Sequence, residues 1–197
     1  MLQPAMSPAR SSQPRCPRCF QRGDPCLCPE IPQVTARLEV VILRHGLEAN
    51  KQTGSARWAA LALGARIVDY AATATPFDPA TLALEGAWLL FPGGEPTPPP
   101  AVPPRRLIVP DGTWQQARRM AHRIPSLRAL PRLALGEAPP GPRLRQPHAP
   151  EGWSTLEAIA AALALCGEPG PAAALRGLHQ AVIRRSERMR GPWVYYR

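Results

Sequence analysis

The chain has 197 residues and a net charge of +10, and this length favours one well-formed core with a small appendage. No stretch approaches the roughly 18 apolar residues of a membrane span, and the first 15 residues hold no apolar run that could act as a secretory signal. The sequence therefore argues against a membrane or secreted protein, and we expect a cytoplasmic location.

The N-terminal part differs in composition from the rest of the chain. Residues 1–15 are rich in proline, serine and arginine with little to bury, so we expect them to be disordered. Residues 16–32 hold a cluster of cysteines. Residues 33–197 are expected to form the main domain.

Four cysteines, Cys16, Cys19, Cys26 and Cys28, fall within thirteen residues. A segment this short cannot form a core of its own, but four thiolates satisfy the tetrahedral preference of zinc in a reducing compartment. The sequence therefore predicts a zinc site, with a set of unmetallated thiols as the alternative. Cys166, in an alanine-rich helical segment, is predicted to be a buried structural residue.

After the cysteines, apolar runs of strand length alternate with helical patterns. Strands are predicted at 38–43, 66–70, 87–91, 107–109 and, interrupted by a proline, 128–135; helices are predicted at 53–63, 114–124, 154–166 and 172–190. This alternation indicates an α/β domain with a mainly parallel sheet.

Residues 106–124 combine a short buried strand with a helix. The run 107–109 is apolar, and Pro110 is expected to end the strand because it has no N–H to donate. Thr113 and Gln116 match the capping-box pattern, so the helix is expected to begin directly after Thr113.

Asp111 lies between this strand and this helix, outside the predicted cap. A carboxylate at the carboxyl end of a parallel strand, just before a helix N-terminus, stands where open α/β sheets bind their ligands. The sequence therefore predicts that Asp111 faces a ligand, with a simple turn residue as the alternative.

A second capping box begins the helix at 154–166, where Ser154 is followed three residues later by Glu157. Glu157 is therefore expected to be a cap. The backbone amides of Ser154 and Thr155 are available to an anionic group at this helix N-terminus.

The positive charge is carried by arginine and is concentrated toward the C-terminus. Lys51 is the single lysine among 24 basic residues, and residues 118–197 hold 13 basic against five acidic side chains. Guanidinium groups favour phosphate or carboxylate recognition, although genome composition explains the scarcity of lysine equally well. A phosphate-binding surface could be formed by Arg118, Arg119, Arg123, Arg184, Arg185, Arg188 and Arg190. For the arginines of the last helix, compensation of the helix dipole is the alternative.

Three common signatures of nucleotide-binding proteins and hydrolases are missing. The first strand is followed by Arg44-His45-Gly46, and no G-x-G-x-x-G, Walker or G-x-S-x-G sequence occurs anywhere. These absences argue against a nucleotide-binding Rossmann site and against a serine hydrolase.

Several of these motifs together resemble the DTW-domain family of tRNA-uridine aminocarboxypropyltransferases. The Asp-x-Thr-Trp sequence of that family stands here as Asp111 to Trp114, and the resemblance extends in order from about Arg15 to Arg190. The further matching residues are the four clustered cysteines, Arg44, His45 and Glu48, Phe91-Pro92, and Ser154 to Ala158. Gly46 departs from the family, which usually has proline after the histidine.

The resemblance implies a SPOUT-like fold with a C-terminal knot, in which 33–197 is the catalytic domain. It also implies that the 3-amino-3-carboxypropyl group of S-adenosylmethionine is moved to N3 of a uridine in tRNA, leaving methylthioadenosine. The residues expected to bind the cofactor are Phe91, Pro92, Pro110, Thr113, Trp114, Ser154 and Thr155. Those expected to contact the substrate are Arg44, His45, Glu48, Arg118, Arg119, Arg184, Arg185 and Arg188.

The sequence is compatible with more than one role for several of these residues. Asp111 is the candidate base, but the positive helix end behind it lowers its basicity, so a hydrogen bond to N3–H or to the cofactor's ammonium is the alternative. Trp114 fits either a stacking surface or the core. His45 and Glu48 either line the site or form a loop salt bridge.

Two other functions fit the same residues. A methyltransferase of the same fold would use the same cofactor and release S-adenosylhomocysteine. A zinc-dependent RNA-binding protein without catalysis would bind no cofactor. If the protein is one of these enzymes, we expect tRNA as its partner, and we expect neither DNA nor a membrane.

Overall fold

The structure is a computed structural model, and it describes residues 14–21, 26–51, 54–71, 77–93, 95–142 and 152–190. The side chains of residues 188–190 are not described. The predicted disorder of residues 1–15 falls almost entirely outside these ranges.

Five parallel strands form one sheet with the order β2-β1-β4-β3-β5. The strands are β1 (Glu39–His45), β2 (Arg66–Tyr70), β3 (Ala87–Leu90), β4 (Arg106–Asp111) and β5 (Arg132–Leu133). The prediction of an α/β domain with a parallel sheet is confirmed.

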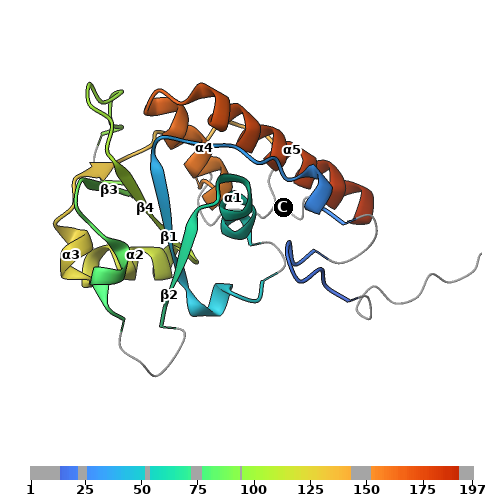
Figure 1. Cartoon of the computed structure of the whole chain (residues 1–197), viewed down its shortest axis with the longest axis horizontal. Helices are drawn as coiled ribbons and strands as arrows, with labels where there is room; N and C mark the ends of the chain where they lie inside the picture. The colour runs from blue at the N-terminus through green and yellow to red at the C-terminus, as the bar shows by residue number, and fades with distance from the viewer. Residues whose placement is uncertain are drawn as a thin grey trace, which may run out of the picture.

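Helices cover both faces of the sheet (Figure 1). On one face lie α1 (Ser55–Leu63), α4 (Thr155–Leu165) and α5 (Pro169–Arg190), and on the other lie α2 (Trp114–Arg123) and α3 (Pro125–Arg128). Successive residues of β1 alternate between the two cores, since Val40 and Ile42 pack with the first group and Val41 and Leu43 with the second. Three short 3-10 helices, η1 (Cys28–Glu30), η2 (Gly46–Glu48) and η3 (Pro79–Leu82), complete the described elements.

The prediction that Pro110 ends its strand is wrong. β4 continues to Asp111, and Pro110 pairs in register with Leu43 of β1. Among the described residues, the pairing of β4 with β3 ends at Ile108, so β4 has an open side at Pro110. A proline is tolerated where a strand has such an open side, because no ladder hydrogen bond is lost there.

Several other boundaries differ from the prediction, and β1 ends at His45, two residues later than expected. The strand expected at 128–135 is reduced to β5, and α3 precedes it. α5 begins three residues earlier than expected, at Pro169. A proline fits the first position of a helix because the N–H at this position makes no hydrogen bond within the helix.

The chain reverses its direction of travel across the sheet between β1 and β4. From β1 it passes through α1 to β2 on one side, and from β4 it passes through α2 and α3 to β5 on the other. In open α/β sheets this switch point, at the carboxyl ends of the strands, is where ligands bind. None of the helices in the described parts of the chain is long and apolar enough to cross a bilayer.

Candidate functional site

Asp111 is the last residue of β4 and lies at the switch point, paired in register with Arg44 of β1. Its side chain is only 8% exposed. The Thr155 hydroxyl, at the start of α4, donates a hydrogen bond of 2.6 Å to Asp111 Oδ1. The packing of α4 near the end of β4 thus brings together two predicted site residues that are 44 positions apart in the sequence.

The turn after Asp111 is closed by the predicted capping box. Gln116 N donates to Thr113 Oγ1 at 3.3 Å, and Thr113 N donates to Gln116 Oε1 at 2.7 Å. A β-carbon added to Gly112 would lie 2.9 Å from Gln116 Cβ and 3.5 Å from His45 Cβ. The cap therefore uses the Thr113 hydroxyl, and the turn lies directly beside the end of β1.

Trp114 lies outside the core, because 51% of its surface is exposed. Its ring stacks on that of Phe91, which follows β3, with centroids 5.4 Å apart and planes inclined by 8°. The Arg132 guanidinium lies 5.7 Å from the Phe91 ring and donates to Pro92 O at 3.1 Å. One edge of the sheet thus carries a supported, accessible aromatic surface on which a planar ring could stack.

The predicted residues after β1 are engaged with their neighbours. Arg44 forms a two-point ion pair with Asp69 of β2, at 2.7 and 2.9 Å. His45 Nδ1 accepts from Leu47 N at 3.3 Å and so caps η2. Glu48 is buried, and Lys51 Nζ donates to its Oε1 at 2.5 Å. The loop salt bridge is therefore present at Glu48, and this loop is an ordered wall beside the Asp111 turn.

The start of α4 has the expected capping box. Ser154 N donates to Glu157 Oε2 at 3.0 Å, and Glu157 N donates to Ser154 Oγ at 3.3 Å. Glu157 Oε2 also lies 3.6 Å from His179 Nε2 of α5. Glu157 is thus a cap, as predicted, and its neighbour Thr155 is the residue that reaches Asp111.

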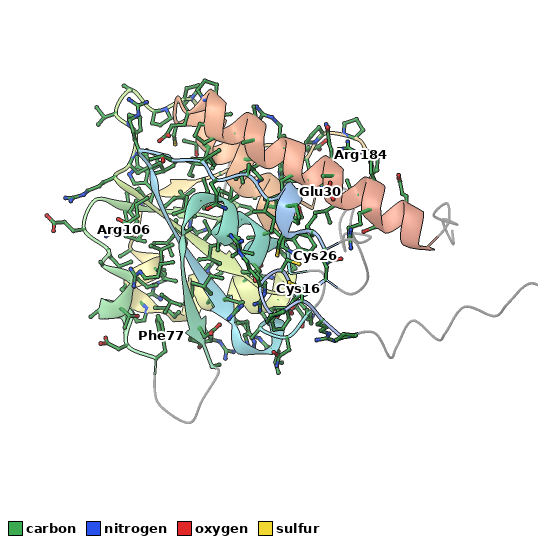
Figure 2. The ribbon with its side chains drawn as sticks, turned by 45° about the vertical axis from the view of Figure 1, so that its right-hand side comes forward. Cys16, Cys26, Glu30, Phe77, Arg106 and Arg184 are labelled. Carbon is green, nitrogen blue, oxygen red and sulfur yellow. The ribbon has the colours of Figure 1, made fainter. Side chains whose placement is uncertain are left out.

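A groove of about 480 Å³ lies between Pro139–Pro142 and α5. Its lining includes Trp153, Arg176, His179 and Arg184. Arg184 projects from α5 and is exposed (Figure 2). Arg176 is also exposed on the same helix, and sequence reasoning missed it because it stands eight residues before the arginine cluster.

The predicted phosphate-binding arginines do not all lie on the surface. Arg118, Arg119 and Arg123 are exposed on α2, as expected. Arg185 is only 4% exposed, and its burial removes it from any surface that a polyanion could contact. The side chains of Arg188 and Arg190 lie outside the described residues. The predicted surface therefore keeps Arg184 and loses Arg185.

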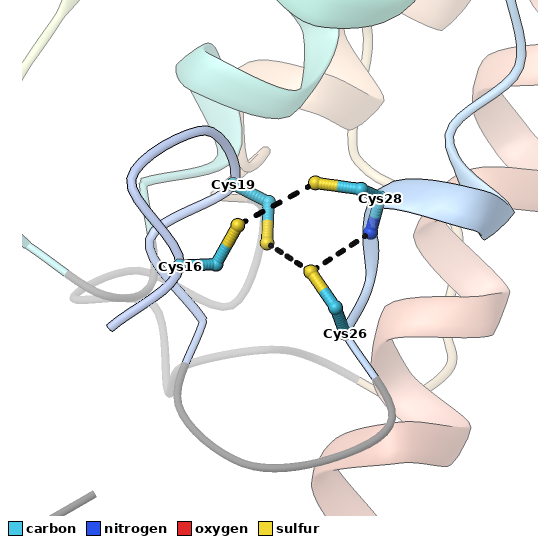
Figure 3. A group of neighbouring side chains, drawn as sticks. All are labelled: Cys16, Cys19, Cys26 and Cys28. Atoms are coloured by element: carbon cyan, nitrogen blue, oxygen red, sulfur yellow. Dashed lines mark hydrogen bonds between the residues drawn. The ribbon is translucent and has the colours of Figure 1, made fainter. Parts of the chain in front are cut away.

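The four clustered cysteines converge in space (Figure 3). Their sulfurs all lie within 4.8 Å of one another, with Cys16 to Cys28 at 3.6 Å and Cys19 to Cys26 at 3.5 Å. Four sulfurs around one zinc ion are separated by about 3.8 Å, given tetrahedral geometry and a Zn–S bond of about 2.3 Å. The donor set and its spacing therefore fit a zinc ion.

The thiols differ in their surroundings. The backbone amides of Cys19 and Arg18 point at the Cys16 sulfur and lower the pKa of this thiol to about 6. Burial and the neighbouring Cys26 thiol raise the pKa of Cys28 to about 12. Burial also raises the pKa of Cys19. The surroundings of the cluster therefore stabilise the thiolate of Cys16 alone. A cation would be needed to hold all four cysteines as thiolates.

The fifth cysteine, Cys166, is 3% exposed, and burial raises the pKa of its thiol. This confirms that it is buried.

The cysteine cluster is attached to the rest of the domain, because Trp58 Nε1 of α1 donates to Cys19 O at 3.0 Å and Cys19 and Leu27 join the core.

These features define an α/β protein whose switch point carries a buried carboxylate beside an accessible aromatic surface, with a cysteine cluster able to hold a metal ion. A family model for the DTW domain matches residues 13–187, and the chain belongs to this family. Membership implies a tRNA-modifying activity. No solved structure matches the chain.

Proposed function

We propose that the protein transfers the 3-amino-3-carboxypropyl group of S-adenosylmethionine to N3 of a uridine in tRNA and releases methylthioadenosine. The observation that carries this proposal is the position of Asp111. It is buried at the switch point, joined to the N-terminus of α4, and lies one turn from the exposed Trp114. We also propose a SPOUT-like knotted path, a cytoplasmic location and a zinc ion on the four cysteines.

The residues around Asp111 offer groups that suit S-adenosylmethionine. The exposed Trp114 ring, supported by the buried Phe91 ring on which it stacks, presents a flat surface to an adenine ring. At the start of α4 the Ser154 amide donates to Glu157 Oε2, so the amide of Thr155 is proposed to meet the carboxylate of the methionyl part. Pro92, Pro110 and Thr113 border the same edge of the sheet. When bound, the cofactor supplies an electrophilic carbon next to its sulfonium.

Asp111 is proposed to hold and remove the proton of uridine N3. As the bond from N3 to the carboxypropyl carbon forms, the carbon–sulfur bond breaks and the N3 proton passes to the Asp111 carboxylate. The Thr155 hydroxyl fixes the orientation of this carboxylate through Oδ1. The N-terminus of α2 favours the charged form of Asp111 and so lowers its basicity, and orientation of N3–H by this carboxylate is therefore proposed as a second contribution.

The tRNA is proposed to lie along exposed arginines. Arg118, Arg119 and Arg123 belong to the helix that begins at the Asp111 turn. Arg176 and Arg184 line the groove beside the start of α4. Guanidinium groups on both elements would contact phosphates without reading sequence. His45 and Glu48 are proposed to shape the wall that the uridine meets, with Arg44 holding that wall to β2.

The experiment that tests this function uses tRNA and two labelled forms of S-adenosylmethionine. With label in the carboxypropyl carbons we expect labelled tRNA, and with label in the methyl group we expect labelled methylthioadenosine and unlabelled tRNA. Methyl label in the tRNA, with S-adenosylhomocysteine as product, would instead identify a methyltransferase. The absence of both transfers, with tRNA still bound, would support a binding protein.

A further inference from the structure

Phe20 adopts an unusual backbone conformation. It follows Cys19 with φ at 60°, in the left-handed region that residues with a β-carbon rarely occupy. Phe20 N donates to Cys16 O at 2.9 Å, and Cys16 N donates to Gln21 O at 2.9 Å, so the strained residue closes the turn around the first cysteine. Glycine would fit this turn without strain, so the phenyl ring must serve a purpose outside the turn.

The Phe20 ring lies under a guanidinium group from another element. Arg57, in the first turn of α1, has its Cζ 3.7 Å from the ring centroid. This is a close cation–π contact. Neither group is fully exposed, which strengthens the attraction relative to one in open water.

The same guanidinium reaches the loop that follows β1. Arg57 Nη2 donates to Ala49 O at 2.6 Å. A second link joins the same two regions, since Arg15 Nη1, next to the first cysteine, donates to Asn50 O at 2.8 Å. The loop 46–51 is therefore fastened to the cysteine cluster at two adjacent carbonyls.

This loop belongs to the wall of the candidate site. It follows His45, whose Cβ would lie 3.5 Å from a β-carbon on Gly112, and it contains the buried Glu48. We propose that the cysteine cluster positions this wall, with Arg57 as the positioning residue and the Phe20 ring as its support. That this wall contacts the substrate rests on the proposed function. That the cysteine cluster holds the loop 46–51 in place rests on the contacts alone.

The test separates the ring from the metal site. Phe20→Gly removes the ring and relieves the turn, so the variant should keep its zinc. Arg57→Met removes the guanidinium and keeps most of the side-chain volume. In both variants we expect hydrogen exchange of the Leu47, Ala49 and Lys51 amides, all hydrogen-bonded within the loop, to rise about fivefold or more. Arg57→Lys should restore part of the protection.

Kinetics provide a readout that a purely structural role would not move. We expect the KM for tRNA to rise in Phe20→Gly and Arg57→Met while kcat changes little. Arg128→Met, at an exposed arginine on α3, is the matched control and should change neither quantity.

Unchanged exchange at the three amides in both variants, with zinc retained, overturns the proposal. Loss of zinc in Phe20→Gly would also contradict it, since the ring would then serve the turn itself. If the wild type transfers no carboxypropyl group, the exchange experiment still decides whether the link exists, so failure of the proposed function and failure of the link are distinguishable.

Discussion

The carboxyl edge of the sheet and the cysteine cluster achieve their geometry in different ways. At the sheet edge, Arg44, Phe91, Asp111 and Thr155 come from separate elements and are held by two packed cores. The four cysteines fall within thirteen residues, and their segment places Cys19 and Leu27 in the core while the other three cysteines pack against it. The first region therefore depends on packing between separate elements, whereas the second is local and gathers four thiols that could hold a metal ion.

This comparison predicts that a substitution at the sheet edge can remove the chemistry and leave the fold intact. Asp111→Asn keeps the size of the side chain and an oxygen that can accept from Thr155. We expect turnover to fall by about 10²-fold or more, because the proton acceptor is lost, while the affinity for S-adenosylmethionine changes only a few-fold. Single-turnover rates and calorimetric binding measure the two quantities.

Thr155→Val is the companion variant, since it removes only the hydroxyl that orients Asp111. Its turnover should fall less, by about tenfold, in line with the loss of one hydrogen bond to a charged group. Turnover near that of the wild type in Asp111→Asn would show that Asp111 is not the proton acceptor.

The contrast also explains what could be predicted from the sequence. The cysteine cluster was predictable because its ligands are close in the chain and their type suits one metal. The bounds of β2 and the two capping boxes were predictable because local hydrogen bonding and hydrophobic pattern decide them.

The contacts that build the site depend on the fold and could not be predicted locally. No sequence pattern joins Thr155 to Asp111 or Arg57 to Phe20, because each pair meets only after the sheet and α1 are in place. The prediction for Pro110 was wrong because a proline ends a strand only where a neighbouring strand would need its N–H, and β3 does not extend that far along β4. Arg185 was misread because charge suggests exposure, and only packing shows which arginines of α5 face inward.

At the cysteine cluster we expect the opposite pattern, with structure lost before chemistry. Cys16→Ser combined with Cys19→Ser should release about one zinc ion per chain and lower the melting temperature. If the loop 46–51 loses the two links that hold it to the cluster, the KM for tRNA should rise about tenfold. The value of kcat should fall less than in Asp111→Asn. Metal analysis, thermal melts and steady-state kinetics provide these values.

Cys166→Ala is the matched control, because this cysteine is buried far along the chain and lies outside the cluster. It should keep its zinc. Freshly purified wild-type protein without zinc would contradict the assignment of the metal site.

The exposed aromatic surface belongs to the sheet edge, so its removal should weaken binding and spare stability. Trp114→Ala should raise the Kd for S-adenosylmethionine or for tRNA by about tenfold, the loss expected for one stacked ring. Trp114→Phe should restore most of the affinity. Val102→Ala, at a residue that is 80% exposed, is the control and should bind normally. Normal binding by Trp114→Ala would confine this side chain to covering Phe91.

The smallest effect is expected away from both regions, at the groove along α5. Changing Arg176 and Arg184 to glutamine should weaken tRNA binding a few-fold and flatten the dependence of log affinity on log salt by about 0.7 to 0.9 for each lost phosphate contact. Affinity for S-adenosylmethionine should stay the same, because neither arginine contacts the sheet edge.

The control for this pair carries the same change in net charge elsewhere on the molecule. Arg105 and Arg128 are both exposed, and Arg105 precedes the amino end of β4, at the opposite edge of the sheet from Asp111. Changing both to glutamine should leave the salt dependence close to that of the wild type. Equal slopes in the two double variants would mean that the groove arginines act only through total charge, and the phosphate contacts would then lie along Arg118, Arg119 and Arg123 of α2.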